Sequence, residues 1–246
     1  MIKASHCGER LSISKWCTMR LISQLSIILP LFMITAFASA GVQVGTTRII
    51  FIEGKKEASV SLDNQDSTPY LIKSWAENDK IAGSHFMVTP PLFRLEAKQK
   101  NVVRIFKLDG TLPADRESLF FFNTTAIPAT TEDTSRNTLQ IAVRTKLKLI
   151  YRPKALKDDM PTSYAGKLTW ERKNNAITVN NPSPYYINFM SITVNNIPLE
   201  LKDINYVAPF SSATYPLKNT NMVSGKIEWI AINDFGGQSK TYQSTF

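Results

Sequence analysis

The 246-residue sequence contains very little cysteine and histidine. It has two residues of each type, and both cysteines, Cys7 and Cys17, lie within the first 17 positions. From Gly41 onward the single histidine is His85, in the segment AGSHFMVTPP, which we interpret as an ordinary loop. Zinc sites and Cys–His or Ser–His nucleophile pairs need several such side chains close together. The composition therefore argues against these sites, and we expect no bound metal.

Other signatures of catalysis are also missing. The sequence holds no glycine-rich phosphate loop of the GxxxxGK type, so we expect no nucleotide cofactor. The adjacent carboxylates Asp158-Asp159 and Glu132-Asp133 lie in polar, turn-rich segments, where such pairs are usually solvated. Glycosidases need two carboxyl groups facing one sugar, and nothing marks such a pair here. We therefore expect that the protein is not an enzyme.

The first 40 residues contain an export signal. From Met19 onward, MRLISQLSIILPLFMITAFASA combines a basic start, an apolar run and small residues at Ala38-Ser39-Ala40. This pattern predicts a secretory signal cleaved before Gly41, with translation starting at Met19. The alternative is an uncleaved anchor, but the apolar run is broken by a serine and a proline and is shorter than the roughly 20 residues of a membrane span. We expect no integral membrane anchor.

Positive charge is the main excess of the rest of the chain. Residues 1–40 hold four of the 29 Lys and Arg and one of the 20 Asp and Glu, which leaves a net charge of +6 after Gly41. Four of the basic residues form a strip, namely Arg144, Lys146, Lys148 and Arg152. A secreted protein meets carboxylates or lipid phosphates rather than nucleic acid, so we expect no nucleic-acid partner.

Nearly every segment after Gly41 is typical of a short strand. Examples are TTRIIFI, SLFFFNTTAI and GKIEWIAIND, and no helical period lasts for a dozen residues. The sequence therefore predicts an all-β protein made of sandwiches. The charged, proline-flanked segment RPKALKDDMP is a candidate linker, which would separate domains of about 115 and about 85 residues.

The segment TLQIAVRTKLKLIYRP, residues 138–153, alternates apolar and basic residues with a period of two. Such alternation predicts a strand with one apolar and one wet face. At roughly 3.3 Å per residue it would extend about 45 Å, well beyond the usual strand of about 5–6 residues. A strand of this length is longer than pairing within one small sheet requires.

Six motifs occur in series over the chain: RIIF, TPPLFRL, LPADRESLFFFNTTAIP, LQIAVRTKLKLIYRP, NPSPYYINF and INDFGG. In their order and spacing the chain resembles the periplasmic chaperones of the chaperone–usher pilus pathway. The resemblance implies two immunoglobulin-like β-sandwiches, 41–157 and 158–246, in a boomerang arrangement with an interdomain cleft. It also implies a periplasmic protein that binds pilus or fimbrial subunits by donor-strand complementation and delivers them to an outer-membrane usher.

The resemblance assigns roles within the long strand. Leu139, Ile141 and Val143 match the donor residues that fill pockets left by the subunit's missing strand. The alternative, that these three side chains face their own core, stays open from the pattern alone, and Leu147 and Leu149 are expected to pack there.

The resemblance also assigns an anchor for the subunit's terminal carboxylate. The resemblance places it at Arg48 in TTRIIF and at Lys148. Such a pair suits a carboxylate, since arginine offers a rigid fork and lysine adds a point charge. Thr47 adjoins Arg48, and parity places Lys146 on the same strand face as Lys148. We rank both as secondary residues of this cleft.

A third set is expected to join the two domains. Glu117, Arg152 and Asp234 match charged positions of an interdomain salt bridge, with Arg104 a candidate participant. Removing one member of such a network is expected to impair folding or domain orientation rather than binding.

The short polar segment ATTEDTSRN, residues 129–137, matches the short-loop class of the family. An exposed apolar strand edge could also produce a self-capping dimer or oligomer. The competing interpretation is a secreted β-sandwich adhesin or carbohydrate-binding protein. It would use aromatic platforms such as Trp75, Trp170 or Trp229, although single aromatics in strands are more often core residues.

Overall fold

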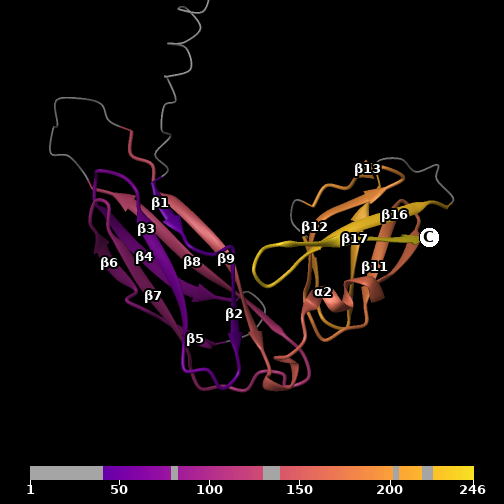
Figure 1. Ribbon diagram of the computed structural model, residues 1–246, viewed down its shortest axis with the longest axis horizontal. Coiled ribbons are helices and arrows are strands. Elements are labelled where there is room, and N and C mark those ends of the chain that lie inside the picture. The colour runs from indigo at the N-terminus through magenta and orange to yellow at the C-terminus, as the bar shows by residue number, and fades with distance from the viewer. Residues whose placement is uncertain (1–40, 79–82, 130–138, 202–204, 218–223) are drawn as a thin grey trace, which may run out of the picture. The chain divides into compact units, whose positions relative to one another are not determined.

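The computed structural model describes residues 41–78, 83–129, 139–201, 205–217 and 224–246 (Figure 1). The expected signal segment and nearly all of the short polar loop lie outside these residues. Strands dominate the described part of the chain. Its helical elements are single turns, namely η1 (Lys154–Leu156), α2 (Pro161–Tyr164) and η2 (Ala165–Lys167). The all-β prediction is therefore confirmed.

The first sandwich consists of two sheets, coloured from indigo to salmon pink in Figure 1. One sheet has the order β1–β3–β7–β5, with bounds Val42–Val44, Ala58–Asn64, Lys100–Lys107 and Phe86–Thr89. The other has the order β2–β9–β8–β4–β6, with bounds Arg48–Ile52, Val143–Arg152, Ser118–Pro128, Tyr70–Glu77 and Leu92–Leu95.

Alternating side chains of these strands form the first core. Val60 and Leu62 of β3, for example, are buried while the intervening Ser61 is exposed. Ile72, Phe122 and Leu149 contribute from the facing sheet and are fully buried. The two-residue period places the apolar half of each strand between the sheets, as the strand pattern predicts.

The second sandwich follows the single-turn helices, in the orange to yellow part of the range. Its smaller sheet has the order β10–β11–β15, with bounds Thr169–Lys173, Ala176–Asn181 and Ser211–Pro216. The larger has the order β13–β12–β16–β17, with β14 also paired to β12; their bounds are Ile197–Pro198, Ile187–Val194, Lys226–Ile232, Gln238–Thr245 and Tyr206–Val207.

Trp170 and Trp229 lie in the core of the second sandwich, with ring centroids 5.2 Å apart. Both are buried, so neither forms a surface platform for a sugar. Trp75 belongs to β4 of the first sandwich, and the guanidinium group of Arg144 lies 4.8 Å from the centroid of its ring. The carbohydrate-binding interpretation thus loses two of its three aromatics.

Strand β9 is shorter than the sequence predicts. It begins at Val143, where its antiparallel ladder with β8 begins opposite Ala126. On its other side β9 pairs with β2 in parallel, but only from Lys148 to Arg152. Residues 139–142 have no ladder partner among the described strands, so the segment leaves the sheet before Val143. Residues 143–147 pair with β8 on one side, and no described strand pairs with them on the other side.

An ion network links the two sandwiches at the C-terminal end of β9. Arg152 Nε donates to Glu117 Oε1 at 2.7 Å, and its two terminal nitrogens donate to Asp234 at 2.6 and 2.9 Å. Glu117 Oε2 also accepts the backbone N–H of Tyr186 at 2.8 Å. These residues therefore meet as the resemblance implies. Arg104 is elsewhere, 3.6 Å from Glu57.

The network holds its charges in a dry environment. Burial raises the pKa of Glu117 to about 7, against the opposing effects of Arg152 and the Tyr186 N–H. Burial alone would lower the pKa of Arg152, but Asp234 and Glu117 outweigh it and raise the pKa above its ordinary value. Arg152 therefore remains charged and compensates both carboxylates.

Replacing Arg152 with alanine is expected to lower the free energy of unfolding by about 3–5 kcal/mol, because the variant leaves the buried Glu117 carboxylate without its cation. A folded-state carboxyl pKa raised above the unfolded value costs stability as pH rises. The loss should therefore be larger at pH 8 than at pH 5. Urea unfolding at both pH values measures it. Arg94→Ala, which removes the exposed Arg94–Glu96 pair, is the control, and equal losses in both variants would contradict the assignment.

Candidate functional site

The first strand and the long strand bring two cations together. Arg48, the first residue of β2, lies opposite Lys148 of β9 in the parallel ladder. Opposite residues of a ladder share one face of the sheet, so both side chains project from the same side. Arg48 Nε is buried and has no hydrogen-bond partner within the described part of the chain. The pair is thus a concentrated positive site with unused donor capacity.

Residues of the second sandwich position Lys148. Its ammonium nitrogen donates to Asn188 Oδ1 at 2.5 Å and to Asn205 Oδ1 at 2.7 Å, and it lies 4.6 Å from the centroid of the Tyr206 ring. An ammonium group has three donors. The two amide oxygens accept two of them, and one is available for a further oxygen atom.

The electrostatics of this pair favour an anion. Burial, and then the charge of Arg48, lower the pKa of Lys148 to about 7. Burial also lowers the pKa of Arg48, and Asp234 opposes that shift. Two like charges in a partly dry site destabilise each other until a negative group joins them. A carboxylate would accept the guanidinium fork of Arg48 and the remaining Lys148 donor.

The two secondary residues have separate environments. Thr47 is exposed beside the turn Asn233–Gly237, where a Cβ on Gly236 would lie 2.6 Å from Thr47 Oγ1 and where φ is +88°. Glycine is therefore required at that close approach. Lys146 forms an ion pair with Glu77 at 3.0 Å, and its ammonium lies 4.2 Å from the Phe121 ring centroid. Its charge is already compensated within the first sandwich.

The three residues that the resemblance assigns as donors lie at the N-terminal end of β9, with Val143 as its first residue and the other two just before it. Leu139, Ile141 and Val143 are 85%, 64% and 59% exposed, whereas Leu149, farther along the strand, is fully buried in the first core. These exposures are high for large apolar side chains so close to a core. These three side chains therefore form an exposed apolar surface, the kind of surface that marks interaction sites.

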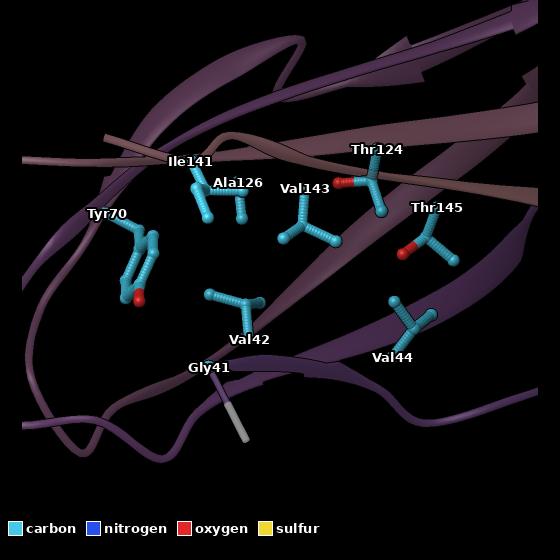
Figure 2. A pocket seen from close by; sticks show the side chains of 9 residues that line it. All are labelled: Gly41, Val42, Val44, Tyr70, Thr124, Ala126, Ile141, Val143 and Thr145. Carbon is cyan, nitrogen blue, oxygen red and sulfur yellow. The ribbon is translucent and has the colours of Figure 1, made fainter. Parts of the chain in front are cut away.

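A pocket of about 230 Å³ opens beneath this surface. Figure 2 shows Ile141 and Val143 on one side of it and Val42 and Val44 of β1 on the other. Ile141 and Val143 thus face the space between their own two sheets without filling it. The side chains of Ile141 and Val143 therefore point inward and yet stay largely exposed.

Sequence reasoning missed Asn188, Asn205 and Tyr206. They reach Lys148 from positions 40 to 58 residues along the chain, and no local pattern marks such contacts. Within the described ranges, no group of three His, Cys, Asp or Glu side chains could hold a metal ion. No helix of that part of the chain is both long and apolar enough to cross a membrane.

Comparisons with known proteins agree with this geometry. Residues 41–157 match the family described as pili and flagellar-assembly chaperone, PapD N-terminal domain, and residues 163–243 match the pili assembly chaperone PapD, C-terminal domain. The chain is 37% identical over 229 residues to the chaperone protein PsaB of Yersinia pestis, which covers 83% of each chain. It is 39% identical over 210 residues to the chaperone protein FimC of Escherichia coli K12, covering 83% of this chain and 84% of FimC.

Solved structures give the same result. A chain of the Salmonella enterica complex of SafA pilin with the SafB chaperone superposes with a TM-score of 0.76 and 36% identity, covering 86% of this chain and 99% of that one. The Escherichia coli chaperone DraB superposes with a TM-score of 0.72 and 34% identity, covering 83% and 95%. The chain therefore belongs to the PapD-like family of pilus assembly chaperones.

Proposed function

We propose that this protein is a periplasmic chaperone that binds pilus or fimbrial subunits by donating the open edge of β9 and delivers them to an outer-membrane usher. The observation that carries the proposal is the exposed apolar edge of residues 139–147 ending at the Arg48–Lys148 pair. In this proposal residues 1–40 are the secretory signal, and residues 41–157 and 158–246 are the two domains.

Strand addition fits the geometry of β9. Residues 143–147 pair with β8 on one side, which leaves the other side able to form a second backbone ladder. The exposed Ile141 and Val143 would be covered when a partner strand joins, and full burial of such side chains contributes roughly 1.5–3 kcal/mol each. The solved relative SafB is seen in complex with a pilin, which supports a pilus subunit as the partner here.

The anchor determines the direction of the partner strand. If the partner's last residue places its carboxylate at Arg48 and Lys148, its preceding residues lie along β9 from residue 147 back to residue 139. The partner then runs in the same direction as β9. It continues, in parallel, the ladder that β2 forms from Lys148 onward.

The anchor also determines register. A slip of one residue would turn every inward side chain of the added strand outward. A carboxylate bound by Arg48 and Lys148 prevents this slip, because the chain end has one position. In this proposal Thr47 and Lys146 are secondary residues of the cleft, and Asn188 and Asn205 support Lys148.

The energy for the proposed cycle comes from folding and strand exchange. The family consists of chaperones rather than enzymes, and the sequence carries no phosphate loop of the GxxxxGK type. A free chaperone with an open apolar edge would also be prone to cap itself as a dimer or oligomer. The adhesin alternative is not favoured, because two of its candidate platforms, Trp170 and Trp229, are core residues.

Substituting Arg48 or Lys148 with alanine, one at a time, is expected to weaken subunit binding by roughly 10- to 100-fold, the effect of losing one charge-assisted hydrogen bond. Both variants should stay folded, with a small loss of stability in Lys148→Ala, because Lys148 donates to Asn188 and Asn205. Isolation of complexes after co-expression with pilus subunits, plus thermal unfolding, checks both points. Lys73→Ala is the control. Normal capture by both variants would remove the anchor assignment.

Binding of a peptide with a free C-terminal carboxylate is expected to weaken as pH rises above about 7. The pKa of Lys148 is about 7 in the free protein, and a bound carboxylate favours the ammonium form, so binding takes up a proton at higher pH. Titration at pH 6.5, 7.5 and 8.5 should show the dissociation constant rising by up to about tenfold per pH unit. Lys148→Arg keeps its charge and should remove the slope, and an unchanged slope would refute the role of Lys148.

Replacing Ile141 with aspartate is expected to abolish subunit capture while leaving the melting temperature unchanged. The side chain is 64% exposed in the free protein, so a polar group costs little there, but the same group would be buried without a partner in the complex. Gln140→Asp, the adjacent position of opposite parity, is the matched control. Capture by Ile141→Asp at the wild-type level would exclude this residue as a donor.

A further inference from the structure

The outer face of β9 carries two basic residues besides Lys148, namely Arg144 and Lys146. Both contact one carboxylate on β4. Glu77 Oε1 lies 3.1 Å from Arg144 Nη2 and 3.0 Å from Lys146 Nζ. Glu77 Oε2 accepts the indole N–H of Trp75 at 3.0 Å. Glu77 is thus the common acceptor for three donors.

Arg144 has a second attachment, to the strand between β4 and β9. Its Nε and Nη2 donate to Asn123 Oδ1 of β8 at 3.1 and 2.8 Å. Asn123 is completely buried, so this acceptor does not move with the surface. The guanidinium also lies 4.8 Å from the centroid of the Trp75 ring. Arg144 is therefore held by charge, by a fixed amide and by an aromatic face.

The contacts join three neighbouring strands at one place. Glu77 and Trp75 belong to β4, Asn123 to β8, and Arg144 and Lys146 to β9. Arg144 is the second residue of β9, immediately after the point where the chain enters the sheet. This is also the stretch, residues 143–147, whose backbone has a described ladder on only one side.

The network is more than a pair of surface ions. Single exposed ion pairs contribute little to stability, because solvent screens them and because forming the pair costs side-chain conformational freedom. Here one carboxylate meets two cations and an indole, and the Trp75 hydrogen bond, followed by Lys146, lowers the pKa of Glu77 despite partial burial. The carboxylate is therefore ionised across the neutral range, and the contacts can act together.

We propose that Glu77 is a positioning residue that holds the start of β9 against β8, so that Ile141 and Val143 are presented at a fixed register from Arg48 and Lys148. The inference rests on the proposed donor role of β9 for its functional meaning. Its physical content concerns the free protein alone. Glu77 acts through Arg144 and Lys146 and does not touch the bound subunit.

Amide hydrogen exchange of the free protein tests the physical content. Glu77→Gln keeps the shape of the side chain and removes its charge. Exchange at residues 143–147 should become about threefold to tenfold faster, the effect of losing one or two ion pairs, while β3 in the other sheet exchanges as before. Glu57→Gln is the matched control, because Glu57 also pairs with an arginine, Arg104, in the same sandwich. Unchanged exchange at 143–147, or equally faster exchange in β3, would overturn the inference.

Binding of a purified pilus subunit to the same two variants tests the functional content. Glu77→Gln should bind about threefold to tenfold more weakly, and Glu57→Gln should bind like the wild type. Faster exchange with unchanged binding would overturn the presenting role. If the wild-type protein binds no subunit, the proposed function itself fails, and the exchange experiment still decides whether Glu77 holds β9.

Discussion

The incomplete pairing of β9 is the constraint on which the rest of the site depends. β8 accompanies the strand from Val143 to Tyr151, whereas β2 accompanies it only from Lys148 onward. The unmatched stretch exposes backbone groups that a folded protein normally pairs. It also leaves Ile141 and Val143 exposed and the pocket beneath them open. Arg48 and Lys148 lie where the unmatched stretch ends, so the apolar edge and this pair of cations adjoin each other.

The ends of β9 are held by different kinds of interaction. At the C-terminal end, Arg152 is buried between Glu117 and Asp234, where each charge depends on the others. At the N-terminal end, Arg144 and Lys146 meet Glu77 on a partly exposed face. The first arrangement joins the sandwiches, and the second leaves the strand accessible. Under the proposed function β9 accepts a new neighbouring strand, so it can be held strongly only where that neighbour does not reach.

Much of this arrangement follows from local sequence patterns. Alternation in residues 138–153 predicted both the apolar and the basic face of β9. The meeting of Glu117, Arg152 and Asp234 was implied by the family resemblance and by no local pattern. The start of β9 at Val143 was not predicted, because it depends on where β8 ends its ladder. Asn188, Asn205 and Glu77 were missed for a similar reason. Their partners are between 40 and 69 residues away in sequence. No local sequence pattern around an asparagine or a glutamate predicts contact with so distant a lysine or arginine.

The place of β2 in the ladder has a consequence for the kind of chain that can be captured. A segment lying parallel to β9 and reaching Arg48 meets the first residue of β2 head-on, in the same row of the sheet. An internal strand of another protein would have to continue through the space that β2 occupies, and it is sterically excluded. Under the proposed function, the site therefore selects the end of a polypeptide over an internal segment. A truncated or extended subunit would still place its own terminal carboxylate at Arg48 and Lys148, but its preceding residues would then be shifted in register along residues 139–147.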